Sequence, residues 1–385
     1  MGNPSGSVFL AHLSDIPVLR YMTYKAIGLM SGSSLDGLDI AFVEFVHNAG
    51  KWSFEILATD CYDYDLEWKE RLKNATALNA FDYALLHADY GHYIGKAVNR
   101  FIEENALQYK VGLIASHGHT TFHNPQKRLT AQLGDGAAIA ASTGLPVVSD
   151  LRALDVAFGG QGAPIVPIGE KLLLKDYDMY LNLGGIANIS FNHPDSYIAF
   201  DVCPANRVLN IMAAYEGKEY DAGGQMAAGG HVHNEALQKL NGLSYYAQPY
   251  PKSLANSFGT DDVYPLLASF GLSTADGLRT YVEHIVQQLK FSIVNQHSIG
   301  VENTKLLVTG GGAFNTFLIE QLSAALASLN VEVVIPEADL IQYKEALIMA
   351  FMGVLRWRQE YTVLSSVTGA VRDSIGGAVW IGQEA

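Results

Sequence analysis

The sequence predicts a mixed α/β fold, and three observations lead to it. Apolar runs of strand length recur along the chain, several of them end in glycine-rich turns, and longer segments with helical spacing of apolar residues separate them. Strands in direct succession, followed by a helix and a further strand, are typical of a mixed sheet. The 385 residues are enough for two domains of ordinary size.

The composition is that of a globular protein with an acidic surface. Hydrophobic residues make up 49% of the chain, and 39 Asp and Glu against 25 Lys and Arg give a formal net charge of −14. This excess of negative charge argues against nucleic acid or an anionic membrane as partners. No apolar run reaches the roughly 18 residues of a membrane span. Any bound phosphate must therefore be held by backbone amides and a metal ion.

The termini and the cysteines bear on where the protein works. The first residues lack a basic start, so a signal peptide is not expected. We interpret residues 1–21 as a leader, or as a mis-called start with Met22 the natural beginning. The two cysteines, Cys61 and Cys203, are too few for a disulfide framework and lack metal-ligand spacing. We therefore expect a cytoplasmic protein. A homodimer is one assembly that the sequence leaves open.

A β-hairpin with a polar tip is predicted at residues 24–46, where two strand-like runs flank a turn rich in Gly, Ser and Asp. Backbone N–H groups and hydroxyls at such a tip suit a phosphate, and Asp36 and Asp39 suit the surroundings of a magnesium ion. An ordinary hairpin with turn-forming residues explains the same pattern equally well. The residues assigned to this loop are Gly32, Ser33, Ser34, Leu35, Asp36, Gly37, Leu38 and Asp39.

The rest of the first half continues this sheet. We expect a strand at 52–59, a helix at 81–107 and a buried strand at 111–115 that ends in the polar residues 116–120. Polar residues at the carboxyl end of such a strand usually face the ligand crevice. The histidines His117, His119 and His123 suggest a metal cluster, but no acidic residue or cysteine accompanies them at a useful spacing. Structural or substrate-contacting histidines are favoured, and no metal-ligating residue is assigned.

Glycine and acidic residues are frequent between residues 132 and 167. This density is typical either of a linker or of backbone that closely approaches a ligand. An apolar strand at 145–148 lies within the segment, which favours a ligand cleft over a linker. Arg152 is a candidate clamp for a carboxylate or phosphate.

The second half opens on another hairpin with a glycine tip. Strands at 179–183 and 186–191 flank the tip, and a third strand at 197–200 ends in Asp201 before a helix. This weak repetition indicates a duplicated domain. Asp201 is well placed to act as a general base, although position alone favours a helix cap.

The last third supplies a second glycine-rich element. An amphipathic helix is expected at 276–294, with Glu283, Gln287 and Gln288 on its outer face. A strand at 305–309 then opens into three glycines and a helix at 316–327. This arrangement is a platform for a nucleotide, although plain close packing also uses such turns.

One further carboxylate stands at the start of the last long helical segment. Glu345 is either a functional group there or a favourable partner of the helix dipole. P-loop, Rossmann, zinc-protease and α/β-hydrolase motifs are absent from the sequence.

Seven blocks of the sequence resemble, in order, the motifs of the anhydro-N-acetylmuramic acid kinase family. They are residues 28–39, 116–120, 132–135, 159–164, 182–188, 310–315 and 366–370. The resemblance implies the actin, hexokinase and Hsp70 (ribonuclease H-like) ATPase fold, in which two duplicated α/β domains with mixed sheets close on ATP and Mg²⁺. It divides the chain into an N-terminal domain, 22–150 plus 360–385, and a C-terminal domain, 151–359.

The family opens the anhydro ring of 1,6-anhydro-N-acetylmuramic acid with water and moves the γ-phosphoryl group of ATP to O6, giving N-acetylmuramic acid 6-phosphate in peptidoglycan recycling. By this resemblance Asp201 is the catalytic base, and Glu345 holds the sugar and the water. The implied cofactor-binding residues are the hairpin loop above with Gly184, Gly185, Gly310, Gly311, Gly312 and Asn315. The implied substrate-binding residues are His117, Gln132, Asp135, Arg152, Gln161 and Asn188.

The chain departs from the family at two blocks. Residues 200–206 read Phe-Asp-Val-Cys-Pro-Ala-Asn where the family has Phe-Asp-Thr-Gly-Pro-Gly-Asn, and residues 250–255 read Tyr-Pro-Lys-Ser-Leu-Ala where it has Pro-Pro-Lys-Ser-Thr-Gly. Each hydrogen bond lost this way costs about 1–3 kcal/mol if a buried donor stays unpaired, enough to reshape a sugar pocket.

Two alternative functions follow from these departures. One is a kinase for another amino sugar or anhydro-sugar. The other is a nucleotide- or sugar-binding regulator of the same fold without turnover. Retention of Asp36, Asp201 and Glu345 argues against the regulator, because a pure binder needs no base.

Overall fold

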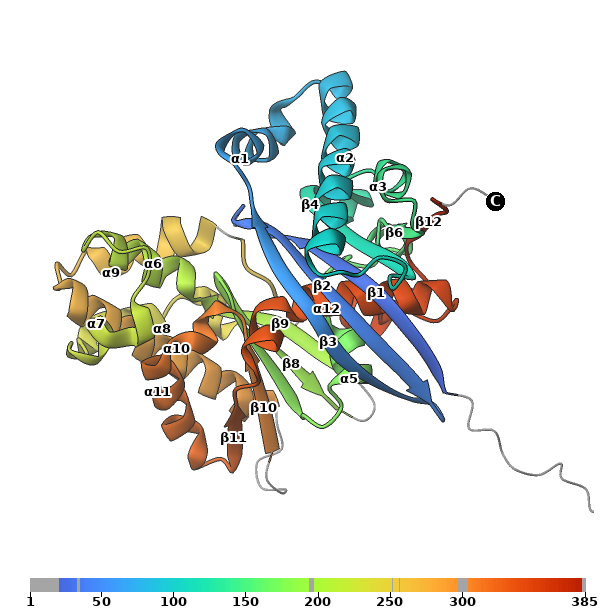
Figure 1. The fold of residues 1–385 in the computed structure, drawn as a ribbon. Helices are drawn as coiled ribbons and strands as arrows, with labels where there is room; N and C mark the ends of the chain where they lie inside the picture. The colour runs from blue at the N-terminus through green and yellow to red at the C-terminus, as the bar shows by residue number, and fades with distance from the viewer. Residues whose placement is uncertain are drawn as a thin grey trace, which may run out of the picture.

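The computed structural model describes residues 21–32, 35–193, 197–250, 252–255, 257–296 and 304–382. In this part of the chain two mixed sheets lie side by side, and helices flank both (Figure 1). The leader that we assigned to 1–21 and the loop residues Ser33 and Ser34 lie, apart from Tyr21, outside the described residues.

The first sheet is built mainly from the N-terminal third of the chain. Its strands are β1 (Met22–Ser31), β2 (Gly37–Asn48), β3 (Lys51–Asp63), β4 (Leu113–Asn124), β5 (Leu129–Leu133), β6 (Val147–Ser149) and β12 (Ala378–Trp380). The order is β12-β6-β4-β1-β2-β3, and β5 pairs with β4 off this path. The last strand of the chain therefore completes the sheet that the first strand begins.

The second sheet repeats the arrangement of the first. Its strands are β7 (Met179–Leu183), β8 (Ile186–Asn192), β9 (Tyr197–Pro204), β10 (Thr304–Thr309) and β11 (Val331–Val334), in the order β11-β10-β7-β8-β9. In each sheet an antiparallel three-stranded meander comes first, and two further strands are added in parallel beside its first strand. This shared order confirms the predicted duplicated α/β fold of the actin-like class.

The helices confirm the longer predicted segments. They are α1 (Leu66–Lys73), α2 (Ala80–Glu104), α3 (Gly136–Thr143), α4 (Ala153–Ala157), α5 (Pro167–Leu173), α6 (Asn206–Ala214), α7 (Gln225–Ala228), α8 (Asn234–Asn241), α9 (Tyr264–Ala268), α10 (Thr274–Gln296), α11 (Thr316–Ala327), α12 (Ala338–Trp357) and α13 (Ser365–Thr368). Within the described ranges, none of these helices has the length and apolar character needed to cross a membrane.

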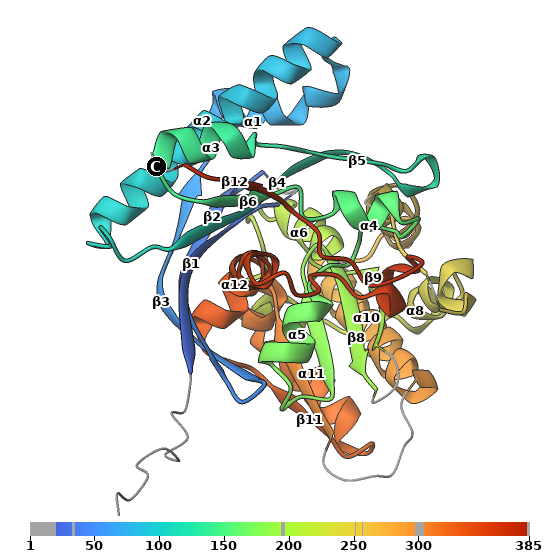
Figure 2. The same cartoon turned by 90° about the vertical axis from the view of Figure 1, so that its right-hand side faces the viewer.

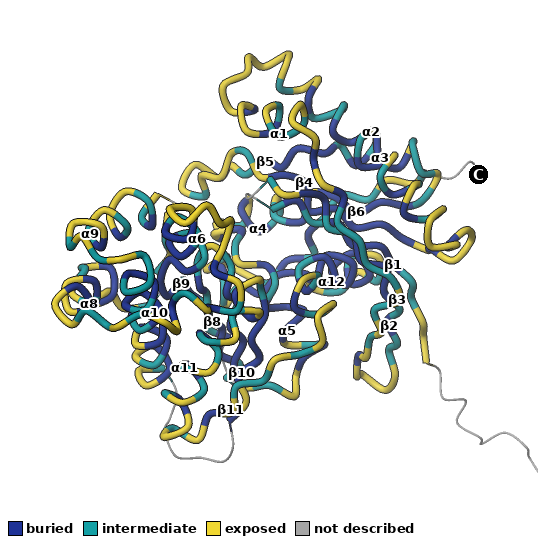
Figure 3. Tube along the Cα trace, turned by 60° about the vertical axis from the view of Figure 1, so that its left-hand side comes forward, coloured by how far each residue is buried: buried dark blue, intermediate teal, exposed yellow. Residues whose placement is uncertain are grey.

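Helix α12 lies between the two sheets (Figure 2). Every residue from Ala346 to Leu355 is buried, as expected for a helix that is apolar on all sides, and the trace is dark along this stretch in Figure 3. Gly28 of β1 allows the close approach, because a Cβ atom there would lie 1.8 Å from the Ala346 carbonyl oxygen. One apolar cluster therefore joins α12 to both sheets, including Ala41 of the first and Tyr180 of the second.

The other faces of the sheets carry separate cores. Ile27 and Leu29 of β1 pack with residues of α2, such as Tyr90 and Val98, in one cluster. Leu181 and Leu183 of β7 belong to another cluster, together with buried side chains of α6, α10 and α11. The two halves thus have their own outer cores and share the middle one.

Three local predictions are wrong in detail. Strand β4 continues to Asn124, so the polar residues 116–120 lie within the strand and not beyond its end. Gln288 is buried on α10, where its amide donates to Asn241 at 2.8 Å. Glu345 does not start α12, because the helix begins at Ala338; non-helical angles at Tyr343 (φ −110°, ψ 15°) interrupt it two residues earlier.

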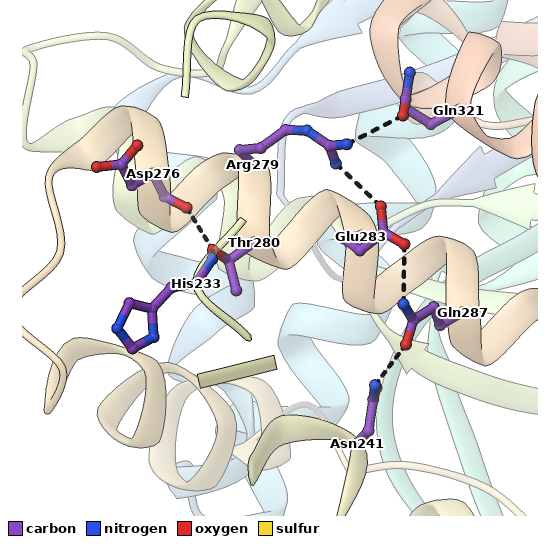
Figure 4. Close-up of polar contacts among 8 residues, drawn as sticks. All are labelled: His233, Asn241, Asp276, Arg279, Thr280, Glu283, Gln287 and Gln321. Atoms are coloured by element: carbon purple, nitrogen blue, oxygen red, sulfur yellow. Dashed lines mark hydrogen bonds and ion pairs between the residues drawn. The ribbon is translucent and has the colours of Figure 1, made fainter. Parts of the chain in front are cut away.

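The polar side of α10 joins neighbouring helices (Figure 4). Arg279 donates to Glu283 within the helix and to Gln321 of α11, each at 3.2 Å. Gln287 accepts from Asn241 of α8 at 2.8 Å. These contacts tie the helical layer together and lie away from the pocket described below.

The domain limits stay a prediction. Residues of the proposed C-terminal domain, those of α12, pack on strands of both sheets, and the segment after α12 returns to the first sheet through β12.

Candidate active site

Buried polar side chains form hydrogen bonds at the base of the first hairpin tip, the turn between β1 and β2. Ser31, the last residue of β1, lies 3.2 Å from the His119 ring and accepts a hydrogen bond of 2.8 Å from the Tyr64 hydroxyl. Leu35 adopts a left-handed conformation (φ 60°), which an L side chain rarely does without a constraint. The side chain of Leu38 is buried in the core, so only its backbone is available to a ligand. The described part of the tip therefore presents main-chain groups to a ligand, and buried side chains hold these groups in place.

Carboxylates from both ends of the chain meet beside this tip. A pocket of about 170 Å³ is lined by residues from β2, the end of β7, the end of β10 and α12. The lining residues are Asp39, Asn182, Thr309, Gly310, Ile341, Gln342, Lys344 and Glu345. Three predicted site residues, Asp39, Gly310 and Glu345, are thus brought together although they are far apart in the sequence.

Asp39 lies in an unusually acidic environment. Burial, together with the nearby charges of Glu345 and Asp36, raises its pKa to about 6, and a hydrogen bond with Cys61 opposes the shift. Cys61 lies directly opposite Asp39 in the β2–β3 ladder. A divalent cation would relieve this accumulation of negative charge, and carboxylate oxygens are the ligands that Mg²⁺ prefers.

This environment predicts a pH-dependent gain of stability for Asp39→Asn. Because the pKa of Asp39 is raised on folding, the folded protein is stabilised by protonated Asp39 at low pH and loses this contribution as pH rises from about 4 through about 6. The variant should therefore melt at a higher temperature than the wild type at pH 7.5, without nucleotide or divalent cation, and show a smaller gain at pH 5, which lies within this window. Thermal melts at the two pH values test this, with the exposed Asp63→Asn as control. An equal gain at both pH values would contradict it.

A row of polar side chains crosses the second sheet from the pocket to Asp201. Asn182 of β7 pairs with Asn188 of β8, which pairs with Asp201 of β9. Directly paired residues project from the same face of a sheet, so these three side chains form one row. A bulge between Ala187 and Asn188 sets the register of the last pair.

Asp201 is held by main-chain and aromatic groups and does not cap the following helix. Its Oδ2 atom accepts a hydrogen bond of 2.9 Å from the Leu254 N–H, and its carbonyl oxygen accepts one of 2.6 Å from the Tyr245 hydroxyl. The position before α6 is taken by Ala205, so the helix-cap interpretation is wrong. Burial raises the pKa of Asp201, and the Leu254 hydrogen bond opposes this.

The loop after β10 lies against this row. Gly310 has φ 81°, and a Cβ atom there would lie 2.2 Å from the Asn182 Oδ1 atom, so only glycine fits. Gly312 approaches Leu183 in the same way, with a Cβ contact of 2.7 Å, whereas Gly311 is less confined. Close packing against the second hairpin is therefore one role of these glycines. The same conformation can also leave main-chain groups of the loop accessible to a ligand.

The tip of the second hairpin is tied to the start of α6. The carbonyl oxygens of Gly184 and Gly185 accept hydrogen bonds from the N–H groups of Asn206 and Ala205, at 3.1 and 2.8 Å. The Asn206 side chain adds a bond of 2.9 Å to the Leu183 carbonyl oxygen. Asn315 caps α11, where its Oδ1 atom accepts from the Leu318 N–H at 3.0 Å.

Arg152 lies where three of the sequence blocks meet, 116–120, 159–164 and 366–370. Its Nε atom donates to His117 Nε2 at 2.8 Å, and a second guanidinium nitrogen donates to the Gly162 carbonyl oxygen. Asp155 accepts from the Gly162 N–H at 2.8 Å and from the Thr368 hydroxyl at 2.7 Å. The glycine-rich segment is therefore structured around a charged group, and the linker interpretation is wrong.

The charge state of this cluster follows from its burial. Burial, together with the charge of Arg152, lowers the pKa of His117 to about 3, so the imidazole is neutral and its Nε2 atom accepts. Burial also lowers the pKa of Arg152, to about 10, against the charges of Glu345 and Asp155. Arg152 thus remains a cation at neutral pH, within electrostatic reach of Glu345.

The remaining predicted substrate residues have hydrogen bonds within the protein. Gln132 donates to the hydroxyls of Thr120 and Thr130, at 3.3 and 2.9 Å. Asp135 caps α3 by accepting from the Ala137 N–H at 2.9 Å. The backbone N–H of Gln161 donates to the Thr368 carbonyl oxygen at 2.8 Å, and the Gln161 side chain is exposed. Their roles as sugar ligands stay predictions.

The three histidines do not share one partner. His117 contacts Arg152, His119 contacts Ser31, and the His123 ring lies 3.1 Å from the Thr130 hydroxyl. Among the described residues, no group of three or more His, Cys, Asp or Glu side chains could hold a metal ion by itself. A metal at this site would need oxygen ligands from water or from a bound phosphate.

Five pocket residues were missed in the sequence: Asn182, Thr309, Ile341, Gln342 and Lys344. Asn182 and Thr309 lie at or next to the ends of strands that lead into glycine turns, and that position was a usable signal. Lys344 precedes Glu345, but nothing in the sequence pointed to its partner. It forms a buried ion pair of 2.9 Å with Glu170 of α5. Glu170 also accepts from the Tyr197 hydroxyl.

The first family departure falls in the core of the second half. Val202, Cys203 and Ala205 are almost fully buried and belong to the apolar cluster of that half. Added side-chain volume at these positions is therefore in contact with apolar neighbours.

The chain matches known proteins over nearly its whole length. The family model of anhydro-N-acetylmuramic acid kinase matches residues 24–382. Anhydro-N-acetylmuramic acid kinases of Sulfurimonas denitrificans and Vibrio cholerae are 32% and 34% identical to it, each over 92% of this chain and over 98% and 97% of their own lengths. Among solved structures, the activator of the 2-hydroxyisocaproyl-CoA dehydratase from Clostridium difficile with bound ADPNP matches with a TM-score of 0.41 at 14% identity, over 87% of this chain and 96% of that one.

Proposed function

Because the chain belongs to the anhydro-N-acetylmuramic acid kinase family, we propose that it phosphorylates 1,6-anhydro-N-acetylmuramic acid with ATP and opens the anhydro ring with water. The water oxygen bonds to C1 and gives its proton to Asp201. The C1–O6 bond breaks, O6 bonds to the γ-phosphorus, and ADP leaves. The product is N-acetylmuramic acid 6-phosphate, made in the cytoplasm during peptidoglycan recycling.

The row Asn182, Asn188 and Asp201 is the observation that supports this proposal most directly. It runs from the pocket shared with Asp39 and Glu345 to the carboxylate that takes the proton. Phosphoryl transfer depends mainly on positioning and on neutralising charge. A base at one end of the row and phosphates at the other would place the sugar between them.

The pocket holds the phosphate end of the nucleotide in this proposal. Its 170 Å³ is smaller than the roughly 300–1,000 Å³ typical of sites that enclose a whole ligand. The donors are main-chain N–H groups of the first hairpin and of the loop at Gly310. Mg²⁺, when bound, supplies charge neutralisation for the phosphates, and Asp36 and Asp39 are the carboxylates that would hold it.

Glu345 and Arg152 act on the sugar side. Glu345 lines the pocket at the interruption of α12 and would hold the sugar and the attacking water. Arg152 is held by His117 and Gly162, so its guanidinium is oriented before any ligand arrives. Asn188, in the middle of the row, would contact the sugar directly.

ADP release from the purified protein tests the proposed reaction. Assays contain ATP and Mg²⁺, with and without 1,6-anhydro-N-acetylmuramic acid, and the product is identified by mass. Sugar-dependent ADP release with addition of one water and one phosphoryl group is expected. Release that depends instead on another amino sugar or anhydro-sugar would reassign the substrate. ATP binding without release for any of these sugars would favour the regulator.

A further inference from the structure

Tyr64 forms a hydrogen bond to each side of the first hairpin tip. It directly follows β3, its backbone N–H donates to the Asp36 carbonyl oxygen at 3.3 Å, and its hydroxyl donates to Ser31 Oγ at 2.8 Å. Ser31 is the last residue of β1, and Asp36 immediately precedes β2. One residue from outside the hairpin therefore connects the two ends of its turn.

The Tyr64 hydroxyl belongs to a chain of buried hydrogen bonds. Its single hydrogen is donated to Ser31, so the Tyr90 hydroxyl of α2 is the donor in its hydrogen bond with Tyr64. Ser31 Oγ also lies 3.2 Å from Nδ1 of His119, on β4. All four side chains are buried, and a buried polar group that loses its partner is costly. The chain of hydrogen bonds therefore fixes where Ser31 Oγ lies.

Helices α1 and α2 hold the ring of Tyr64 in place. Its centre lies 6.2 Å from the ring centre of Tyr90 and 5.9 Å from that of Tyr93, both on α2. Trp68 of α1 packs on Tyr93 at 4.7 Å, and the Arg71 guanidinium lies 4.3 Å from the centre of the Trp68 ring. Close-packed aromatic contacts restrict a buried side chain to one orientation. The Tyr64 hydroxyl is thus oriented by the helices before any ligand binds.

These contacts lie on the opposite side of the sheet from the pocket. Met30 pairs with Asp39, which lines the pocket, whereas the next residue, Ser31, pairs with Leu38. Neighbouring residues of a strand point to opposite faces of the sheet, and Leu38 packs in the same apolar cluster as Tyr64. Tyr64 therefore reaches a ligand in the pocket only through the turn.

The described part of the turn depends on contacts with its surroundings. The Leu35 N–H donates to the Gly32 carbonyl oxygen at 3.4 Å, which is long for a hydrogen bond between main-chain groups. The left-handed conformation of Leu35 costs free energy and persists only where the surroundings impose it. The Leu35 side chain packs against the cluster that contains Tyr64. The conformation of the turn is therefore set by its neighbours as well as by its own sequence.

We propose that Tyr64 is a positioning residue for nucleotide binding, because by joining Ser31 to Asp36 it holds the turn in the conformation that binds phosphate. This inference rests on the proposed function, which places the phosphates and Mg²⁺ at this tip. With the turn held, its main-chain N–H groups and the Asp36 carboxylate need little reordering when MgATP binds, so less conformational entropy is lost. The hydroxyl acts through Ser31, the group to which it donates.

A double-mutant cycle on this hydrogen bond tests the proposal. Tyr64→Phe keeps the ring and the N–H bond to Asp36 and removes only the hydroxyl, and Ser31→Ala removes the same hydrogen bond from its other end. Titration calorimetry with MgATP, without sugar, should show about 3- to 10-fold weaker binding for each variant, the usual contribution of one hydrogen bond. Tyr64→Phe should add no further loss to Ser31→Ala, because both changes break one bond. Affinity for 1,6-anhydro-N-acetylmuramic acid should be unchanged.

Tyr62→Phe is the matched control. Tyr62 lies in β3, two residues before Tyr64, and its hydroxyl donates to Glu104 at the end of α2 and not to the tip. This variant should bind MgATP as the wild type does. Thermal melts establish that each variant is folded, and if Tyr64→Phe does not fold, the MgATP affinity of Ser31→Ala decides in its place.

Three results would overturn the inference. Unchanged MgATP affinity in folded Tyr64→Phe would show that the hydroxyl does not serve the turn, and losses that multiply in the double variant would show that it does not act through Ser31. Equal losses of MgATP and sugar affinity would show a general effect on the fold. If the wild type binds MgATP but releases no ADP with the sugar, the proposed function fails, and the same titrations still decide the inference. If the wild type binds no MgATP, both fail.

Discussion

The Asp201→Asn variant is expected to lose sugar-dependent ADP release by about 10²- to 10⁴-fold, the usual contribution of a general base. Asparagine keeps the size of the side chain, and its carbonyl oxygen can still accept from the Leu254 N–H. What it loses is the capacity to take the proton of the attacking water. Steady-state ADP release measures the effect, and ATP binding should be unchanged because the pocket is two strands away.

The pH profile gives this prediction a second test. Burial raises the pKa of Asp201, although the Leu254 hydrogen bond opposes the shift, so the base becomes protonated at a higher pH than an ordinary aspartate. Wild-type kcat should fall as pH decreases through this pKa, and the residual activity of Asp201→Asn should lack that limb. Asp176→Asn, an exposed carboxylate of the same half, is the matched control. Full turnover by Asp201→Asn would exclude Asp201 as the base.

Breaking the buried pair of Glu170 and Lys344 is expected to have the largest effect on stability. Both side chains are 3% exposed, their charged atoms are 2.9 Å apart, and the pair joins α5 to α12. Replacing either residue leaves the other charge buried without its partner, which typically costs about 3–5 kcal/mol. Glu170→Met and Lys344→Met should each lower the free energy of unfolding by this amount in urea titrations.

The double variant distinguishes an ion pair from two independent contributions. Glu170→Met with Lys344→Met removes both charges and fills the space with apolar chains, so it should be more stable than either single variant. The exposed pair Arg100 and Glu104 on α2 is the control, since solvent screens its charges and its disruption should change stability far less. Additive losses at Glu170 and Lys344 would contradict the coupling.

Local patterns predicted most of the elements. The hairpins at 24–46 and 179–191 and the helices at 81–107 and 316–327 have strong periodicity and clear turn residues, and the structure contains all of them. The error at β4 has a physical cause. His117 and His119 are polar, but both are buried in the strand against Arg152 and Ser31, so their polarity did not mark its end.

The assembly of the site depends on contacts that local patterns do not encode. The row from Asn182 to Asp201 depends on strand register and on one bulge, and a slip of one residue would turn a side chain to the other face. Glu170 and Lys344 are 174 positions apart, and no periodicity links them. The carboxylates of Asp39 and Glu345 likewise come close together only when α12 packs between the sheets.

The packing of α12 and β12 on the first sheet also fixes the order in which the two halves can be completed during synthesis. All five strands of the second sheet have left the ribosome once residue 334 has emerged. The first strands of the chain belong to the first sheet, but this sheet is complete only after α12 and β12, at 378–380, have also emerged. Until then the face of β1 and β2 that α12 covers stays open, so a nascent chain halted before residue 338 would expose it to chaperones and to aggregation.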